Sequence, residues 1–232
     1  MAILDLLFPK RCVRCGKFGA YICPQCRTGV FPIQATDMIC PMCEKPAIDG
    51  VVHPRCRTRY SLDGVYAFFH YRSTIPSVVK ALKYRAVSDI CESCAQLALT
   101  TSAASFLQSP AFTQHEHAVC VPIPLHPIRQ NVRGFNQSEV LGRHIMQKLH
   151  IPIDADILYR TIYTVPQVEM KDRHERLLNM KRVFAVRPEA GVLPPYVLLF
   201  DDVWTTGATM RAAANALKRQ GVKRVWAVTF AR

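Results

Sequence analysis

Apolar residues in the longer, second part of the chain follow two spacings, one typical of strands and one typical of helices. Short apolar or aromatic runs predict strands at residues 62–71, 118–123, 197–200 and 224–230. Apolar residues that recur three and four positions apart predict helices at residues 75–84, 89–107, 136–149 and 208–219. Because strands alternate with helices, we expect an α/β fold with a mainly parallel sheet. Ligands of such sheets bind beyond the carboxyl ends of the strands.

The first 60 residues differ from the rest because they show no helical periodicity. They hold seven of the ten cysteines, together with several prolines and glycines. A segment of this size buries little apolar surface and needs covalent or metal cross-links. We therefore expect two domains, at residues 1–60 and 61–232.

Four cysteines near the start have the spacing of a zinc site: Cys12, Cys15, Cys23 and Cys26. Each C-x2-C pair forms a tight knuckle, and two knuckles complete a tetrahedron around Zn²⁺. Without a sign of export, metal is a better explanation than disulfides. All four positions are filled by protein ligands, which indicates structural rather than catalytic zinc.

A second set repeats this layout with Cys40, Cys43, His53 and Cys56. Three cysteines and one histidine form an ordinary structural zinc site. Two alternatives stay open: His53 could be a solvated loop histidine, and ligands could be exchanged between the two sets. Cys91 and Cys94 fall in a helical pattern, and Cys120 in an apolar strand, so we expect these three to be buried rather than metal-bound.

The chain is basic, with a net charge of +13 from 30 Lys and Arg against 17 Asp and Glu. This charge favours polyanionic partners such as nucleic acid, nucleotides or pyrophosphate compounds, although it could also serve only to keep the protein dispersed. No apolar run approaches the roughly 18 residues that span a bilayer, and residues 2–8 are too short for a signal sequence. We expect a cytoplasmic protein without membrane insertion.

The segment 197–209 reads VLLFDDVWTTGAT and combines three features at one strand-to-helix corner. Asp201 and Asp202 follow the apolar run, and a turn rich in hydroxyl groups and glycine leads into the helix. Carboxylates suit the hydroxyls of a ribose, and the amides at a helix start suit its phosphate. The alternative is an ordinary turn between strand and helix, which leaves the adjacent acids without a reason.

Two further segments carry unusual residues. After the strand at 118–123 we expect a proline-containing turn, a basic loop and then a helix from Asn136, where Arg133 could bind phosphate or Asn136 could simply cap the helix. Residues 160–182 are dense in charge, with a charged helix or mobile arm at 172–182. The alternative there is a solvated charged face.

Taken in order, these motifs resemble the ComF/GntX family over the whole chain. They are the cysteine knuckles, Val-Pro-Ile-Pro-Leu at 121–125, Arg-Gly-Phe-Asn-Gln at 133–137, Arg-x3-Thr-x2-Gln at 160–167, Arg-x2-Asn at 176–179 and the loop at 201–209. The loop is also similar to that of type I phosphoribosyltransferases. His53 stands where the family has cysteine, and the glycine expected just after Leu82-Lys83-Tyr84 is missing.

The resemblance implies a double zinc ribbon followed by a type I phosphoribosyltransferase-like domain. It implies a bacterial protein of natural competence and DNA uptake, which binds phosphoribosyl pyrophosphate and Mg²⁺ and is an enzyme of unnamed acceptor. The implied catalytic residues are Asp201 and Asp202. They would bind the substrate together with Thr205, Thr206, Gly207, Ala208, Thr209 and Arg133. Further residues of an active-site loop would be Lys83, Gln167, Arg173, Arg176 and Asn179.

A second hypothesis is a non-catalytic uptake factor that binds single-stranded DNA or DNA-processing proteins and uses the nucleotide pocket as a sensor. Zinc ribbons commonly bind nucleic acid or protein. Basic residues are available at Arg11, Arg14, Lys17, Arg55, Arg57 and Arg59. Phe18, Tyr21 and Tyr60 could stack on bases, or could instead pack beneath the zinc knuckles.

Overall fold

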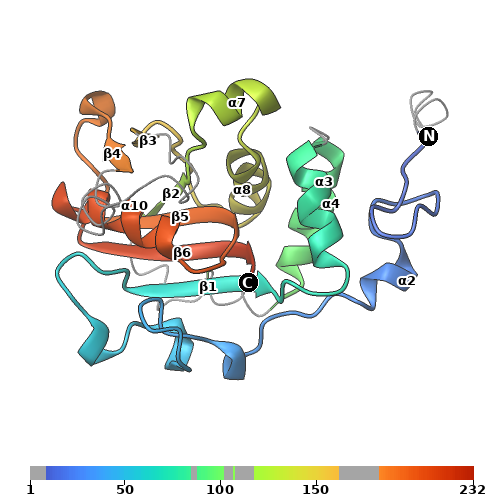
Figure 1. Cartoon of the computed structure of the whole chain (residues 1–232), viewed down its shortest axis with the longest axis horizontal. Coiled ribbons are helices and arrows are strands. Elements are labelled where there is room, and N and C mark those ends of the chain that lie inside the picture. Colours follow the sequence, from blue (N-terminus) through green and yellow to red (C-terminus); the bar gives the residue numbers. More distant parts are fainter. Residues whose placement is uncertain (1–8, 85–87, 102–106, 108–117, 162–182) are drawn as a thin grey trace, which may run out of the picture.

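The centre of the molecule is a parallel sheet of four strands. The computed structural model describes residues 9–84, 88–101, 107, 118–161 and 183–232 (Figure 1). In it β1 (Gly64–Phe69), β6 (Arg224–Ala231), β5 (Tyr196–Val203) and β2 (Ala118–Pro122) lie side by side in that order, and all neighbours are parallel. The strands expected from the apolar runs are thereby confirmed, and their carboxyl ends meet at one edge.

Helices cover both faces of this sheet, because alternate residues of each strand enter two different cores. Leu198 and Phe200 pack in the core that includes α3 (Ile75–Tyr84), α4 (Ser88–Leu99) and α8 (Gln137–Lys148). Val197 and Leu199 pack in the core that includes α10 (Ala208–Arg219). Central strands buried on both faces are apolar throughout, which explains their continuous rather than alternating pattern.

One helix prediction and one loop prediction need correction. The helix expected over 89–107 ends at Leu99 in the structure, where the Thr100 and Thr101 hydroxyls donate to the Leu97 and Ala98 carbonyl oxygens. Side-chain bonds of this kind compete with continuation of a helix.

The prediction of a basic loop before Asn136 is wrong, because the segment forms α7 (Pro127–Arg133). His126 caps its start by accepting from the Ile128 N–H at 3.2 Å, and Pro127 occupies the first helical position. Gly134, with φ of 76°, ends the helix in the left-handed conformation.

A small antiparallel pair, β3 (Leu158–Arg160) with β4 (Phe184–Val186), lies beside α10 and was not predicted. Strands of three residues are too short to produce a recognisable alternation. The arm expected at 172–182 lies outside the described residues.

Residues 31–60 of the N-terminal segment run along the outer edge of the sheet, below β1, whereas residues 10–27 lie beside α3 and α4 (Figure 1). Pro32 pairs with Phe69 and Val51 with Gly64 as isolated bridges, and the Ile33 N–H donates to the Phe68 carbonyl at 3.0 Å. This segment contains α2 (Pro24–Arg27) and three short 3₁₀ turns, η1 (Ala35–Asp37), η2 (Ile48–Gly50) and η3 (Pro54–Cys56), while a fourth, η4 (Pro188–Ala190), follows β4. The edge strand β1 is thus covered by the cysteine-bearing segment.

Candidate functional site

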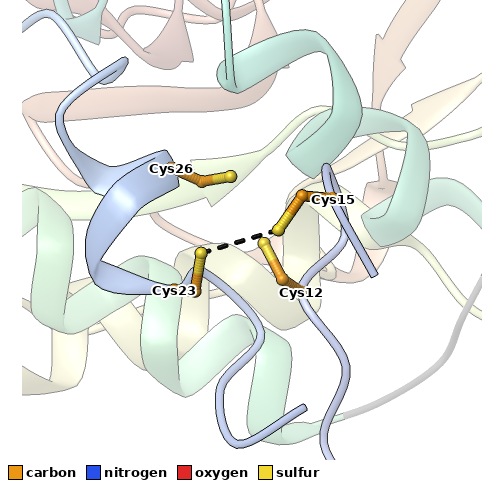
Figure 2. Close-up of side chains that lie close together, drawn as sticks. All are labelled: Cys12, Cys15, Cys23 and Cys26. Atoms are coloured by element: carbon orange, nitrogen blue, oxygen red, sulfur yellow. Dashed lines mark hydrogen bonds between the residues drawn. The ribbon is translucent and has the colours of Figure 1, made fainter. Parts of the chain in front are cut away.

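The first four cysteines form one cluster, in which their side chains converge (Figure 2). The Sγ atoms of Cys15 and Cys23 lie 3.6 Å apart, and all four sulfur atoms lie within 4.8 Å of one another. In a tetrahedral zinc site with Zn–S bonds of about 2.3 Å, sulfur atoms are about 3.8 Å apart. The cluster therefore fits a zinc ion.

The second cluster consists of Cys40, Cys43, His53 and Cys56, so the ligand sets are sequential rather than exchanged. His53 Nδ1 lies 3.3 Å from Cys43 Sγ, while His53 Nε2 lies 3.0 Å from the Pro46 carbonyl oxygen. When Nε2–H donates a hydrogen bond to this carbonyl, the lone pair of Nδ1 is available to a metal ion, as is usual for metal-binding histidines. His53 thus lies in the cluster and not in a solvated loop, and the two clusters suggest two structural zinc ions.

Backbone hydrogen bonds build the two knuckles in the same way. The Cys12 N–H donates to Lys17 O at 2.8 Å, and the Cys40 N–H donates to Lys45 O at 2.9 Å. Burial opposes ionisation of the Cys12 thiol, but hydrogen bonds from backbone groups outweigh it and lower its pKa to about 6. The same balance lowers the pKa of Cys40 to about 7. In the same clusters, burial together with the neighbouring thiols raises the pKa of Cys26 to about 12, and the neighbouring thiols together with burial raise that of Cys56 to about 11. Thiolates crowded together without a cation repel one another, which is the charge that a zinc ion would compensate.

The remaining cysteines are buried in the α/β core, as the helical and strand patterns predicted. Burial raises the pKa of Cys91 to about 11 and raises those of Cys94 and Cys120 further. Neither of the metal clusters found among the described residues includes them.

The two adjacent carboxylates lie at the carboxyl end of β5. The strand extends to Val203, so Asp201 and Asp202 belong to its last residues and not to the turn after it. Asp201 Oδ1 accepts from the Ser138 hydroxyl at 2.6 Å and from the Asp202 N–H at 2.9 Å. Burial, followed by the neighbouring Asp202 charge, raises the pKa of Asp201 to about 7.

Lys83 reaches the same place from the last turn of α3. Its Nζ lies 3.0 Å from Asp202 Oδ2, and the Asp202 side chain is 7% exposed. The structure therefore places Lys83 beside the carboxylates, although the glycine that usually follows this motif is missing.

The turn after β5 leads directly into α10. Gly207 has φ of 66°, and a Cβ there would overlap the ring of Trp204, so only glycine fits. The N-cap residue Gly207 offers no side chain to α10, and the Ala208 N–H donates a long hydrogen bond of 3.5 Å to the Thr206 hydroxyl. Thr205, Thr206 and Thr209 are exposed, so three hydroxyl-bearing residues face solvent at the start of α10.

The segment 133–138 fastens α8 to the end of β2. The Asn136 side chain accepts from the Ser138 N–H and donates to the Ile123 carbonyl at 3.0 Å, so it acts as a helix cap. Arg133 donates to Gln137 Oε1 at 3.0 Å. Ser138, which the sequence reasoning missed, follows this motif directly and brings it to Asp201.

A cavity of about 400 Å³ opens beside this segment, between α7, α8 and β3. Asn136, Arg143, Arg160 and Arg187 are among its lining residues. The Ile123 N–H bonds to Phe200 O at 2.8 Å, which places the loop that enters this cavity next to Asp201. Gln167, Arg173, Arg176 and Asn179 lie outside the described residues.

Basic side chains stack on aromatic rings around the zinc ribbon. The Arg11 guanidinium lies 4.2 Å from the centre of the Phe18 ring, and Phe18 is 61% exposed. Arg219 lies 4.5 Å from the Tyr60 ring. A second cavity, of about 460 Å³, is lined by Arg11 and Lys80 between the first knuckle and α3.

Comparisons with known proteins agree with these features. Residues 3–57 match the double zinc ribbon domain family. Competence protein F of Haemophilus influenzae is 34% identical over 116 residues, which cover 48% of this chain and 49% of that protein. Competence protein ComFC of Bacillus subtilis is 27% identical over 210 residues, which cover 86% of this chain and 79% of that protein. DNA utilization protein YhgH of Escherichia coli K12 is 36% identical over 105 residues, which cover 45% of each.

The chain thus spans about half the length of Competence protein F and YhgH in these matches. No solved structure matches it. Among the described residues, no helix has the length and apolar character needed to cross a bilayer. Its α/β domain has a parallel four-stranded sheet, which is consistent with a phosphoribosyltransferase-like fold. The chain contains a double zinc ribbon domain and is homologous to the competence proteins ComF and ComFC and to the DNA utilization protein YhgH.

Proposed function

We propose that this protein binds phosphoribosyl pyrophosphate with Mg²⁺ at residues 201–209 and acts in the uptake and use of DNA. One observation carries the proposal: two carboxylates at the end of β5 lead within a few residues to the uncapped start of α10. Both groups lie at the carboxyl edge of a parallel sheet, where ligands of such sheets bind.

The start of α10 supports a 5′-phosphate. The first amides of a helix have no partner within it and, together with the helix dipole, favour an anion. Gly207 lets the backbone turn sharply into the helix, and the exposed Thr205, Thr206 and Thr209 add hydroxyl donors. In this proposal Ala208 contributes its backbone N–H.

The carboxylates support the ribose and the cation. Mg²⁺ is usually held by one or two carboxylates together with phosphate oxygens of the substrate. Asp201 fits this role. Burial and the neighbouring Asp202 disfavour the negative charge of Asp201, which raises its pKa to about 7, and a bound cation would stabilise that charge. Asp202 already faces a cation, Lys83, so we assign it to holding Asp201 and the ribose in position.

The proposed reaction is displacement of pyrophosphate from C1 of the ribose by an acceptor. The bond from the acceptor to C1 forms and the bond from C1 to the pyrophosphate oxygen breaks. The proton that the acceptor loses passes to the departing pyrophosphate or to water. Charge and positioning matter more than a nucleophilic side chain in such a step. In this proposal the pyrophosphate leaves toward the cavity of about 400 Å³, which Arg143, Arg160 and Arg187 line, and Arg133 is assigned to it as a further cation.

The place of this activity in the cell comes from the relatives. Two of them are named competence proteins and one a DNA utilization protein. The net charge of +13 is consistent with work close to nucleic acid.

Calorimetry with phosphoribosyl pyrophosphate and Mg²⁺ tests the proposal. We expect the wild type to bind and Asp201→Asn to bind at least about tenfold more weakly, which corresponds to about 1.4 kcal/mol. Glu189→Gln is the control, because it removes an equal charge from an exposed residue of the 3₁₀ turn after β4. No binding by the wild type, or equal binding by both variants, would refute the proposed ligand.

The exposed Phe18 ring beneath Arg11 favours a second candidate function. Here the protein is a non-catalytic factor that binds single-stranded DNA, and the pocket at 201–209 serves as a nucleotide sensor. Bases stack on exposed aromatic rings, and backbone phosphates pair with basic side chains. Phe18→Ala should weaken binding of an oligonucleotide about fivefold or more, and Arg11→Ala should also reduce its salt dependence. Affinity that both substitutions leave unchanged rules out this surface.

A further inference from the structure

The two zinc knuckles carry different residues at the one position where the backbone is left-handed. In the first knuckle Gly16 follows Cys15 and has φ of 76°, while in the second Glu44 follows Cys43 and has φ of 60°. Both residues donate from N–H to the carbonyl four positions earlier, at 2.9 Å, so the turns are equivalent. Left-handed backbone disfavours residues other than glycine. Glutamate at this position therefore costs about 1–2 kcal/mol relative to glycine, which a favourable contact of its side chain can offset.

Arg211 of α10 supplies this contact. Its terminal nitrogen lies 2.9 Å from Glu44 Oε1, and its Nε donates to the Pro41 carbonyl at 2.7 Å. Pro41 and Glu44 belong to the turn that carries the zinc ligands Cys40 and Cys43. One guanidinium thus holds the second knuckle at two points.

The same side chain also contacts the turn after β5. Arg211 lies in the first turn of α10, where its N–H donates to Gly207 O at 2.9 Å. Its guanidinium lies 5.7 Å from the centre of the Trp204 ring. Trp204 is 3% exposed and packs directly against Gly207. Arg211 therefore joins the second knuckle to the ring that shapes the turn.

We propose that Arg211 is a positioning residue that makes the geometry of the turn at 204–208 depend on the second zinc site. Zinc holds the turn of Pro41 and Glu44 in shape, since small zinc-binding segments unfold without their metal. When this turn unfolds, Arg211 loses both partners and no longer holds Trp204 against Gly207. Binding of a phosphate at α10 then weakens; this last step rests on the function proposed for residues 201–209.

The first knuckle provides an internal comparison. It is attached elsewhere, since Arg14 donates to the Thr74 hydroxyl at 3.1 Å, just before α3. Cys15 and Cys43 are both exposed and occupy the same knuckle position. We expect Cys43→Ser to change the Trp204 fluorescence and Cys15→Ser to leave it unchanged, both in a Trp226→Phe protein.

A second pair of variants keeps all zinc ligands and is the decisive test. Glu44→Gly removes the ion pair and relieves the left-handed backbone. Asp49→Gly is a matched control, because Asp49 is also an exposed acid of the zinc ribbon with positive φ, 50°. Both variants should retain two zinc ions per chain by mass spectrometry.

We expect Glu44→Gly to change the Trp204 emission and to raise the Kd for phosphoribosyl pyrophosphate about three- to tenfold. This range is the effect expected when a partly exposed ion pair is lost and the Arg211 guanidinium is no longer held in place. Asp49→Gly should change neither. The coupling is overturned if the two variants give the same Trp204 emission. A wild type that does not bind phosphoribosyl pyrophosphate refutes the proposed function, whereas the comparison of emission still decides on the coupling. If Glu44→Gly changes the Trp204 emission but not the Kd for phosphoribosyl pyrophosphate, the second zinc site affects the structure of the turn but not phosphate binding, and the proposed link to phosphate binding is overturned.

Discussion

Replacing Gly207 by alanine tests the geometry of the turn at the start of α10. Gly207 has φ of 66° and ψ of 2°, and an added Cβ would overlap the ring of Trp204, which is buried. Gly134 is a close match in backbone conformation, with φ of 76° and ψ of −9°, but a Cβ there would meet nothing within 4 Å. The pair therefore separates the cost of the backbone conformation from the cost of the overlap.

The two contributions have different magnitudes. Left-handed backbone costs alanine about 1–2 kcal/mol, and the lower entropy of the unfolded chain offsets about 0.4–1 kcal/mol of it. Gly134→Ala should thus lower the free energy of unfolding by about 1 kcal/mol. Forcing a methyl group into a packed site costs a further 1–3 kcal/mol or so. We expect Gly207→Ala to lower the free energy of unfolding by about 2–4 kcal/mol.

Urea unfolding of the zinc-loaded protein measures this difference, provided that the dependence on urea is the same for all variants. Gly134→Ala serves as the reference for the loss of stability. Gly207→Ala should also weaken binding of phosphoribosyl pyrophosphate. Equal destabilisation by the two substitutions would show that Trp204 does not restrict the turn, and the reasoning on Gly207 would be wrong.

Three further predictions concern the carboxylates and the zinc. Folding raises the pKa of Asp201 to about 7, so the stability that its protonated form contributes is present below the pKa of the unfolded chain and is lost as pH rises toward 7. Between pH 5.5 and 7.5 the urea midpoint should fall more steeply for the wild type than for Asp201→Asn. Parallel plots of midpoint against pH would contradict this prediction. Ser138→Ala removes the hydrogen bond that lowers this pKa, so the loss of stability should begin at the same pH but continue to higher pH than in the wild type. Stability at pH 8 should therefore drop by about 1–3 kcal/mol, and an unchanged pH profile would mean that the hydroxyl does not act on Asp201. His53→Ala should reduce the zinc content by mass spectrometry from two ions to one, and His53→Cys should restore it; two ions in His53→Ala would remove His53 from the ligand set.

Features that depend on short stretches of sequence were predicted best. The bounds of α3 and α10 were predicted as the structure has them, because their apolar spacing is strong and each lies between clear breaks. The helix α7 was missed, because its seven residues carry few apolar side chains and its signals are the capping residues His126 and Gly134. The second zinc cluster was recognised from spacing alone, including the exchange of cysteine for His53.

The candidate site was predicted only in part. Asp201, Asp202 and the turn into α10 are contiguous, so one segment of sequence contains them. Ser138 and Lys83 come from α8 and α3, and nothing in their own segments shows that they reach these carboxylates. The long-range hydrogen bond from Arg211 to Pro41 joins residues 170 positions apart. Contacts of this kind depend on the order of the strands.

The sequence by itself therefore determined the strands of the central sheet, the helices α3 and α10, the two cysteine and histidine clusters and the pairing of acids with a glycine turn, because each depends on residues close to one another in the chain. Only the tertiary structure decided which groups surround Asp201 and which helix the second knuckle touches. The physical reason is that packing of α3, α8 and α10 on a sheet of order β1-β6-β5-β2 brings distant segments into contact.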